Sequence, residues 1–262
     1  MLIEVSDLSV SYGGLELVRD VSFSLHSGDV LAIVGESGSG KTTVIRAILG
    51  CLPHEGRVSG GKVLFEGEDV LAYTPAKWRH LYGTKAAMIF QDSGSMLNPI
   101  QRVESQFVEY IREHSPMTKQ EAAKAAEAML KKMHLPNPEN VMKSYPFELS
   151  GGMRQRVGVA MAMFFEPRLL LADEPTSALD VTTQAQVVKE MLEICRKDKT
   201  TIIIVTHNIG VAAYMSEQLI VMREGQIVEA GKTDTIISQP RSAYTKELLK
   251  AVPQVGGERY VS

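Results

Sequence analysis

The feature that most constrains the fold is a glycine-rich loop that directly follows a short apolar run. Val30–Val34 is entirely apolar, and residues 35–43 then fit the pattern G-x-x-x-x-G-K-[ST]. This order predicts a buried strand, a loop whose backbone N–H groups surround phosphate, and a helix over 43–49 whose positive end faces the same anion. We therefore expect an α/β fold built around a nucleotide phosphate site.

The residue types in the loop fit a nucleoside triphosphate with Mg²⁺, such as ATP. Lys41 can neutralise the β- and γ-phosphates, and the Thr42 hydroxyl can coordinate Mg²⁺. A chance glycine turn is the alternative, which the strand–loop–helix context disfavours. The predicted nucleotide-binding residues of the loop are Gly35, Glu36, Ser37, Gly38, Ser39, Gly40, Lys41, Thr42 and Thr43.

Two carboxylates end another apolar run, Leu169–Ala172. Asp173 at the carboxyl end of a strand can hold Mg²⁺, directly or through water. Glu174, one residue on, can orient or deprotonate an attacking water molecule. Taken alone, the pair could equally be solvated acids at a strand-to-loop transition. After a phosphate loop, the catalytic interpretation is favoured.

Gln91 and His207 also follow short apolar runs, at 86–90 and 202–205. A lone histidine is usually structural or solvated, so His207 is weak evidence by itself. However, open α/β sheets bind ligands at the carboxyl ends of their strands. We therefore expect Gly35, Gln91, Asp173 and His207 to converge on one γ-phosphate site.

A second glycine-rich segment, Ser150-Gly151-Gly152, precedes a predicted helix over 153–164. Backbone N–H groups and a hydroxyl at a helix start can bind an anion. The alternative is a plain serine N-cap with flexible glycines, and out of context that alternative is the better one.

The region between about 92 and 150 is predicted to be helical. Thr118 and Glu121 have capping-box spacing, and Ala122, Ala126 and Met129 then fall on one helix face. β-type segments at 2–10 and 17–25 precede the phosphate loop. Near the C-terminus, one short helical stretch, 243–251, is followed by a glycine-rich polar end.

Composition limits the protein class. The 262 residues, 44% hydrophobic and 23% charged, are typical of a folded globular protein, and the net charge of −3 disfavours a nucleic-acid partner gripped through its phosphates. Cys51 and Cys195 lie far apart, which argues against a disulfide framework or a cysteine-ligated cluster. No apolar run approaches the ~20 residues of a membrane helix, and the start of the chain lacks signal-peptide character. We expect a cytosolic protein.

Taken together, these motifs make the chain resemble the ATP-binding cassette (ABC) family. The motifs that carry the resemblance, in the family's order, are the phosphate loop, Gln91, Leu149–Gly152, Leu169–Glu174, Ser177–Asp180 and His207. The resemblance implies a P-loop ATPase core with a β subdomain and an inserted helical subdomain, spanning 1–238 with the helical part at about 92–150. Residues 239–262 would form a short tail.

The resemblance also implies site roles. Two such domains pair head to tail, so that Ser150, Gly151 and Gly152 of one approach the γ-phosphate bound to the other. Within one domain, Tyr12 would stack on adenine, although an exposed strand tyrosine is the alternative. Gln91 would sense the γ-phosphate and contact Mg²⁺, and Lys41, Glu174 and His207 would complete the catalytic set.

One branch of the family is particularly similar, the importers of oligopeptides, dipeptides and nickel. The supporting segments are Met88–Asp92 with Leu97–Pro99, Tyr145–Leu149, Ser150–Arg156, Ala172–Gln186 and Tyr244–Leu249. Met153 replaces the family's usual glutamine, residues 93–96 differ from the branch pattern, and the cysteine cluster of some members is absent.

The branch resemblance implies partners and a location. They are a related but distinct ATPase, two transmembrane permeases and an extracytoplasmic substrate-binding protein, with this chain on the cytoplasmic face of a bacterial membrane. Peptide and nickel stay open as substrates, with peptide favoured by the signature segments.

Other function classes fit the sequence less well. A cassette ATPase acting on ribosomes or nucleic acid usually has two cassettes in one chain or a long coiled-coil insert. A phosphotransferase would not need Leu149–Gly152, and a non-catalytic regulatory cassette typically loses Glu174 or His207, both of which are present.

Overall fold

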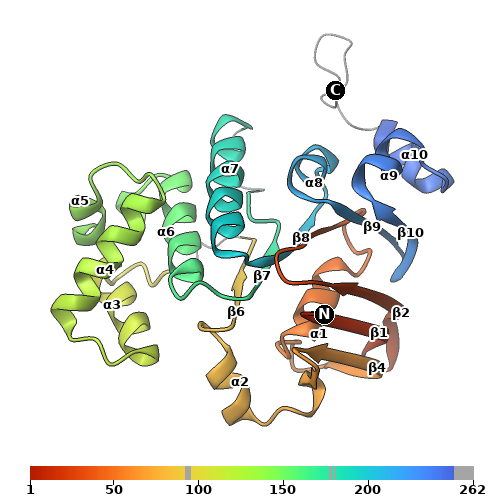
Figure 1. Cartoon of the computed structure of the whole chain (residues 1–262), viewed down its shortest axis with the longest axis horizontal. Helices are drawn as coiled ribbons and strands as arrows, with labels where there is room; N and C mark the ends of the chain where they lie inside the picture. Colours follow the sequence, from red (N-terminus) through yellow and green to blue (C-terminus); the bar gives the residue numbers. More distant parts are fainter. Residues whose placement is uncertain (92–95, 177–178, 180, 251–262) are drawn as a thin grey trace. The chain divides into compact units, whose positions relative to one another are not determined.

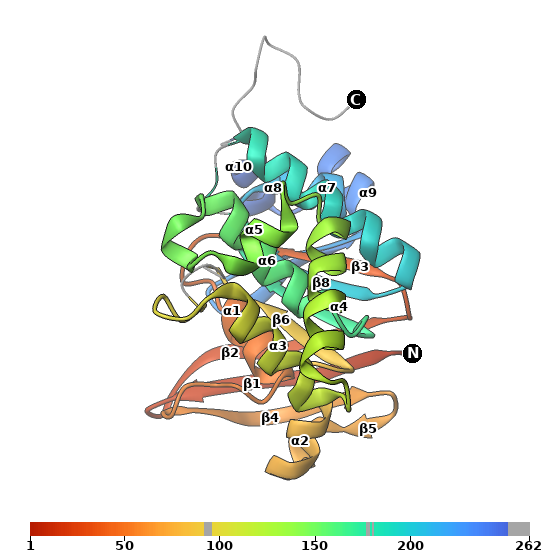
Figure 2. The same ribbon diagram turned by 90° about the vertical axis from the view of Figure 1, so that its left-hand side faces the viewer.

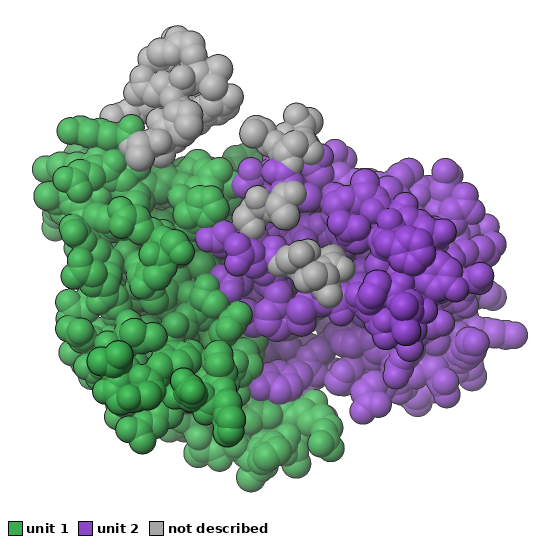
Figure 3. All heavy atoms as spheres, turned by 180° about the vertical axis from the view of Figure 1, so that it is seen from behind, with its two compact units in different colours: residues 1–79, 199–262 green, residues 80–198 purple. Residues whose placement is uncertain are grey.

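The computed structural model describes residues 1–91, 96–176, 179 and 181–250. The chain divides into two compact units, coloured in Figure 3. The first unit combines residues 1–79 with 199–262, and the second is the continuous segment 80–198. Four predictions concern residues that lie wholly or partly outside the described ones: Asp92, the 93–96 departure, Ser177–Asp180 and the polar end after 250.

One half of the first unit is an antiparallel sheet with the strand order β2-β1-β4-β5 (Figure 2). Its strands are β1 (Ile3–Tyr12), β2 (Leu15–Leu25), β4 (Gly56–Phe65) and β5 (Glu68–Asp69). The one-turn 3₁₀-helix η1 (Val70–Ala72) follows, and α2 (Pro75–Leu81) leads the chain into the second unit. The inward side chains of β1, such as Leu8 and Val10, are fully buried.

The other half of the first unit has the strand order β10-β9-β3-β8. Strand β3 (Val30–Val34) lies parallel to β8 (Thr201–Thr206) and to β9 (Gln218–Arg223), and β10 (Gln226–Lys232) runs antiparallel to β9. Every residue of β3 and β8 is buried, as expected for strands covered on both faces. The helices of this half are α1 (Lys41–Ile48), α8 (Ile209–Met215), α9 (Thr233–Ser238) and α10 (Ala243–Lys250) (Figure 1).

The second unit has one parallel strand pair, β6 (Ala86–Ile89) with β7 (Leu169–Asp173). Its helices are α3 (Val103–His114), α4 (Lys119–Lys132), α5 (Pro138–Lys143), α6 (Gly151–Met163) and α7 (Val181–Asp198), with the 3₁₀-helix η2 (Pro146–Glu148) before α6 (Figure 1). Helix α4 packs against α3, α5 and α6.

Most predicted elements are confirmed, with small shifts at their ends. The capping box of Thr118 and Glu121 is present, and Ala122, Ala126 and Met129 are buried on one face of α4. Helix α10 matches the stretch predicted at 243–251 over its described part. Helix α6 begins two residues before the prediction, because Ser150 caps it and both glycines adopt helical backbone in its first turn.

Strands β4, β9 and β10 were not predicted. The boundaries proposed for the helical subdomain and the tail stay predictions. None of the described helices is both long and apolar enough to span a membrane.

Candidate nucleotide-binding site

The phosphate loop connects β3 to α1 in the first unit. Gly40, in a left-handed conformation, precedes the first helical residue, Lys41. The backbone N–H groups of the first helical turn therefore point out of the helix end toward the loop, where the helix dipole favours an anion. Glu36, Ser37 and Gly38 are exposed, whereas Gly35, Ser39 and Lys41 are buried.

Lys41 is enclosed by the loop it follows. Its ammonium group donates hydrogen bonds to the Gly35 carbonyl at 2.8 Å, the Glu36 carbonyl at 2.7 Å and the Ser39 hydroxyl at 3.2 Å. The residue is 5% exposed. A buried cation surrounded by the loop backbone places positive charge where the sequence predicts phosphate.

The loop is fixed against the rest of the first unit by close backbone packing. A Cβ atom on Gly35 would collide with the carbonyl oxygen of Met222 in β9, and φ of Gly35 is +153°. The backbone N–H of Gly225, in the β9–β10 turn, donates to the Ser39 carbonyl at 3.2 Å. The start and the middle of the loop are therefore held by the same β-hairpin.

His207 leaves the sheet beside the start of the loop. Strands β3 and β8 are parallel, and Val34 is the register partner of Thr206. The next residues, Gly35 and His207, therefore emerge at the same level of the same sheet edge. The structure thus brings together these two of the residues predicted to converge, and His207 is exposed there.

Tyr12 ends β1 on the side of the unit that carries the loop. It is half-buried, and its ring covers the Cα of Gly56, where a Cβ would come within 2.7 Å of the ring. Its partner across the hairpin is Leu15, two residues before the β2 segment that passes Gly40. An aromatic ring in this place is suitable for stacking on a base.

In the second unit, the acidic strand end and Gln91 lie together. Strands β6 and β7 are parallel with Ile89 opposite Ala172, so Gln91 and Glu174 follow at equal distance. The Gln91 amide donates a hydrogen bond to the Glu174 carboxylate at 3.3 Å. Asp173 is 4% exposed at the end of β7, and Glu174 has a left-handed backbone with φ of +44°.

The second glycine segment forms the start of α6. The Ser150 hydroxyl accepts a hydrogen bond from the Met153 N–H at 3.3 Å, and Ser150 and Gly151 are exposed. A hollow beside them is lined by Ser150, Gly151, Gly152, Met153, Arg156, Leu179 and Thr183. The N–H groups of a helix start thus open onto a surface hollow, an arrangement that can receive an anion.

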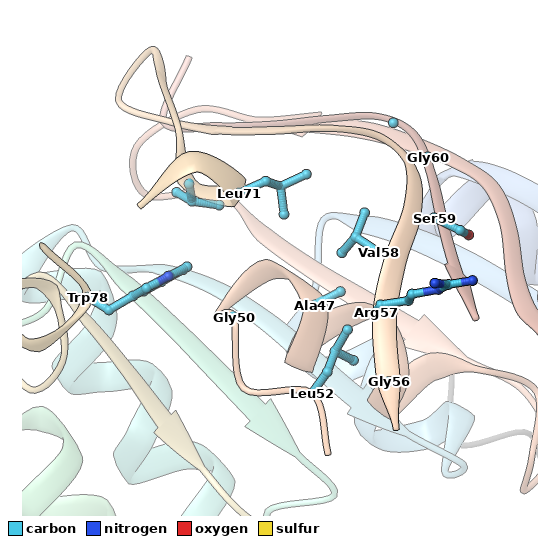
Figure 4. Close-up of a pocket in the computed structure, with 12 residues that line it drawn as sticks. Ala47, Gly50, Leu52, Gly56, Arg57, Val58, Ser59, Gly60, Leu71 and Trp78 are labelled. Atoms are coloured by element: carbon cyan, nitrogen blue, oxygen red, sulfur yellow. The ribbon is translucent and has the colours of Figure 1, made fainter. Parts of the chain in front are cut away.

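A further pocket of about 560 Å³ lies elsewhere in the first unit, between the end of α1, β4, η1 and Trp78 (Figure 4). The Trp78 ring faces Gly50 from one side, and Val58 of β4 projects from the other. None of the predicted site residues lines this pocket.

Two contacts of the loop were missed by sequence reasoning. One is the Gly225 bond described above, and the other is Tyr244 of α10, whose hydroxyl accepts from the Glu36 N–H at 3.0 Å. The segment Tyr244–Leu249 has a recognisable pattern, but nothing in it indicates a contact with residue 36.

Comparison with known proteins agrees with this geometry. The family model described as "ABC transporter" matches residues 18–177, which include the phosphate loop, Gln91, the 150–152 segment and the acidic strand end.

Among curated relatives, the oligopeptide transport ATP-binding protein OppD of Bacillus subtilis is 44% identical over 96% of this chain and 72% of its own length. The dipeptide transport ATP-binding proteins DppD of Bacillus subtilis and Escherichia coli are 42% and 40% identical, over 97% and 98% of this chain and 77% and 80% of their own lengths.

Solved structures of ATP-binding cassettes also share the fold of this chain. The ATP-binding cassette MJ0796, in a dimeric post-hydrolysis state bound to ADP and Pi, has a TM-score of 0.77 at 26% identity, covering 88% of this chain and 98% of that one. The cbiO1 protein of Clostridium perfringens, part of the ABC transporter complex cbiONQ, has the same TM-score and identity over 91% of both chains. The chain therefore belongs to the ABC transporter family, as one of its ATP-binding, ATP-hydrolysing members.

Proposed function

We propose that this chain is the ATPase subunit that powers import of oligopeptides or dipeptides. It would work on the cytoplasmic face of the membrane beside a related but distinct ATPase, two permease chains and an extracytoplasmic binding protein. The observation that carries the proposal is the 40–44% identity to peptide-transport ATP-binding proteins over 96–98% of the chain.

The first unit supplies the nucleotide site in this proposal. Lys41 neutralises the β- and γ-phosphates, Tyr12 stacks on adenine, and His207 contacts the γ-phosphate. The burial of Lys41 within the loop and the common level of Gly35 and His207 support these roles. The loop residues that bind the phosphates through backbone and side chain are Gly35, Glu36, Ser37, Gly38, Ser39, Gly40, Thr42 and Thr43.

The second unit supplies the base for hydrolysis. Glu174 accepts a proton from the attacking water, and the hydrogen bond from the Gln91 amide orients its carboxylate. The same bond gives Gln91 a means of sensing the site, because any movement of Gln91 toward the γ-phosphate changes its contact with Glu174.

The proposed Mg²⁺ ligands fit that ion chemically. Thr42, Gln91 and Asp173 offer hydroxyl, amide and carboxylate oxygens, the hard donors that Mg²⁺ prefers. Asp173 is 4% exposed, and a bound cation would stabilise the negative charge of a carboxylate that is so far removed from water. When bound, Mg²⁺ neutralises charge that develops on the phosphates during transfer.

The glycine segment at 150–152 is proposed to serve the partner ATPase. Ser150 and Gly152 would contact the γ-phosphate held by the partner's loop, so that hydrolysis requires a closed pair. The exposure of Ser150 and Gly151 beside a surface hollow supports a contact with another chain.

The test is ATP hydrolysis by the chain reconstituted in liposomes with the permeases and the ATPase encoded beside it, plus binding protein. We expect short peptides to stimulate hydrolysis several-fold and Ni²⁺-chelates to have no effect. A Glu174→Gln complex is the control, which should bind ATP without turnover.

Two results would overturn the proposal in different ways. Stimulation by Ni²⁺-chelates alone would make the chain a subunit of a nickel importer. Full activity without permeases, raised by ribosomes or DNA, would identify an ATPase that does not energise transport.

A further inference from the structure

We propose that Tyr244 of the C-terminal helix α10 is a positioning residue for the phosphate loop, setting the orientation of the peptide group between Gly35 and Glu36. This inference rests on the nucleotide site proposed above. It gives a role to the Tyr244–Leu249 segment, to which sequence analysis assigned none.

Both polar atoms of this peptide group are bound. Its carbonyl oxygen, on Gly35, accepts from the Lys41 ammonium at 2.8 Å, and its N–H, on Glu36, donates to the Tyr244 hydroxyl at 3.0 Å. A peptide unit is planar, so a bond at each end fixes its rotation. The next carbonyl, on Glu36, also accepts from Lys41 at 2.7 Å.

Tyr244 is itself held firmly enough to act as a brace. It is 6% exposed, and the Arg223 guanidinium lies 4.9 Å from its ring centroid, a cation–π contact. Arg223 is the last residue of β9 and directly precedes the turn whose Gly225 N–H binds the Ser39 carbonyl. The brace and the turn therefore form one support under the loop.

Helix α10 is anchored to β10 just before Tyr244. The Glu229 carboxylate accepts from the backbone N–H groups of Arg241 at 2.9 Å and Ser242 at 3.1 Å. Partial burial acts to raise the pKa of Glu229, but the nearby Thr245 hydroxyl, these two amides and the Arg241 charge outweigh it, so the pKa lies below its ordinary value. The carboxylate is thus stabilised in its charged form as the anchor of α10.

The brace matters because Lys41 has two roles. Its ammonium binds the Gly35 and Glu36 carbonyls in this structure, yet the lysine of such a loop also contacts the β- and γ-phosphates. When Lys41 turns toward phosphate, its hold on the Gly35–Glu36 peptide weakens. The Tyr244 hydroxyl binds the other end of that peptide and does not depend on Lys41, so it preserves the loop's shape during the exchange.

The decisive variant is Tyr244→Phe, which removes the hydroxyl and keeps the buried ring. Since one hydrogen bond contributes about 0.5–1.5 kcal/mol, we expect ATP to bind roughly 2- to 10-fold more weakly by titration calorimetry. Turnover at saturating ATP should be nearly unchanged, so the effect appears in KM and not in kcat.

Tyr110→Phe is the matched control. The Tyr110 hydroxyl donates to the Gly83 carbonyl at 3.0 Å in the second unit, so this variant loses a comparable bond. Its ATP affinity should equal that of the unmodified chain. Equal ATP affinity in Tyr244→Phe, Tyr110→Phe and the unmodified chain would overturn the inference.

A second route reaches the same brace without changing Tyr244. Glu229→Ala removes the acceptor that anchors residues 241 and 242, and it should weaken ATP binding in the same direction. In the double variant with Tyr244→Phe, the fold loss in ATP affinity should be smaller than the product of the two single-variant fold losses, because both variants disable the same support. Full multiplicativity would show that the two residues act independently and would contradict the inference.

Two further measurements separate the possible failures. If Lys41→Ala also leaves ATP affinity unchanged, the proposed site is wrong; if Lys41→Ala weakens binding and Tyr244→Phe does not, only the brace is wrong. Should Tyr244→Phe fail to fold, hydrogen exchange in the unmodified chain decides. Linkage requires ATP to slow exchange of the α10 amides if the loop and α10 are coupled, and unchanged exchange would refute the coupling.

Discussion

Helices α1 and α6 both begin at glycine-rich segments, and the two segments are built differently. The loop before α1 exposes residues 36–38, but Gly35, Ser39 and Lys41 are buried and its backbone is bonded to Gly225 and Tyr244. The segment at the start of α6 lies on the surface, with Ser150 and Gly151 exposed beside a hollow.

The difference indicates how each segment binds an anion. A loop whose peptide groups are oriented in advance has little ordering cost when phosphate binds, so it is suited to holding a nucleotide by itself. A surface turn with a helix dipole behind it is suited to a site completed by another chain. The comparison therefore predicts that mutations in the first segment change folding and binding together, whereas mutations in the second separate them.

The largest effect is expected from Lys41→Ala. The variant removes a buried ammonium that binds three loop acceptors and leaves the Gly35 and Glu36 carbonyls without their charged donor. The variant also removes the proposed hydrogen bonds from Lys41 to the β- and γ-phosphates. Each hydrogen bond to a charged group contributes about 1.5–3 kcal/mol, so the loss of two should lower ATP affinity by roughly 100-fold or more. Titration calorimetry with ATP measures this loss, and near-normal affinity would contradict the preorganised loop.

The next effect concerns the packing of the first segment. Gly35→Ala would force a Cβ into the Met222 carbonyl, whereas Gly38→Ala meets no atom within 4 Å and has φ of +81°. We expect Gly35→Ala to lower the free energy of unfolding by about 2–4 kcal/mol and Gly38→Ala by about 1–2 kcal/mol of backbone strain. Urea unfolding distinguishes them, and equal losses would mean that the Met222 contact relaxes freely.

The corresponding glycines of α6 should behave differently. On Gly151 a Cβ would come no closer than 4.0 Å to Leu179, but on Gly152 it would lie 2.6 Å from the Thr183 methyl group. Gly151→Ala should therefore keep or raise stability, since alanine favours a helix by about 1 kcal/mol over glycine. Gly152→Ala should destabilise, and adding Thr183→Ser, which removes that methyl group, should restore most of the loss. Thermal unfolding of the single and double variants tests this, and no rescue would exclude the methyl contact as the cause.

The sequence predicted the parts of the molecule that depend on local pattern. Strands β3, β7 and β8 are buried on both faces and appear as continuous apolar runs. Strand β4 was missed because only two of its ten residues are buried and it contains Gly60 and Gly61, the latter with φ of +88° against the backbone of Asp7. Strand β10 was missed because it is mostly exposed.

The site shows the same division. Phosphate-loop, acidic and glycine motifs are contiguous and carry their chemistry in their residue types, so they could be located from sequence. The brace by Tyr244 could not, because its partner Glu36 lies 208 positions away and contributes a backbone N–H that any residue would have. Contacts that use main-chain atoms across long separations have no sequence signal of their own.

The smallest effect on stability, and the sharpest test of the comparison, comes from Ser150. Its hydroxyl caps α6 through the Met153 N–H, so Ser150→Ala should cost about 1 kcal/mol of unfolding free energy. Ser150→Asp caps as well as serine and also favours the helix dipole, so its stability should equal or exceed that of the unmodified chain.

ATPase activity of these two variants should follow the opposite order to their unfolding free energies. A carboxylate at position 150 would repel the triphosphate of the partner, so a stable Ser150→Asp chain should lose more ATPase activity than the less stable Ser150→Ala chain. Mixed pairs, with one mutant and one unmodified site, would locate the loss in the partner's site. If activity instead followed unfolding free energy across both variants, Ser150 would act as a helix cap alone, and the two glycine segments would differ in burial but not in purpose.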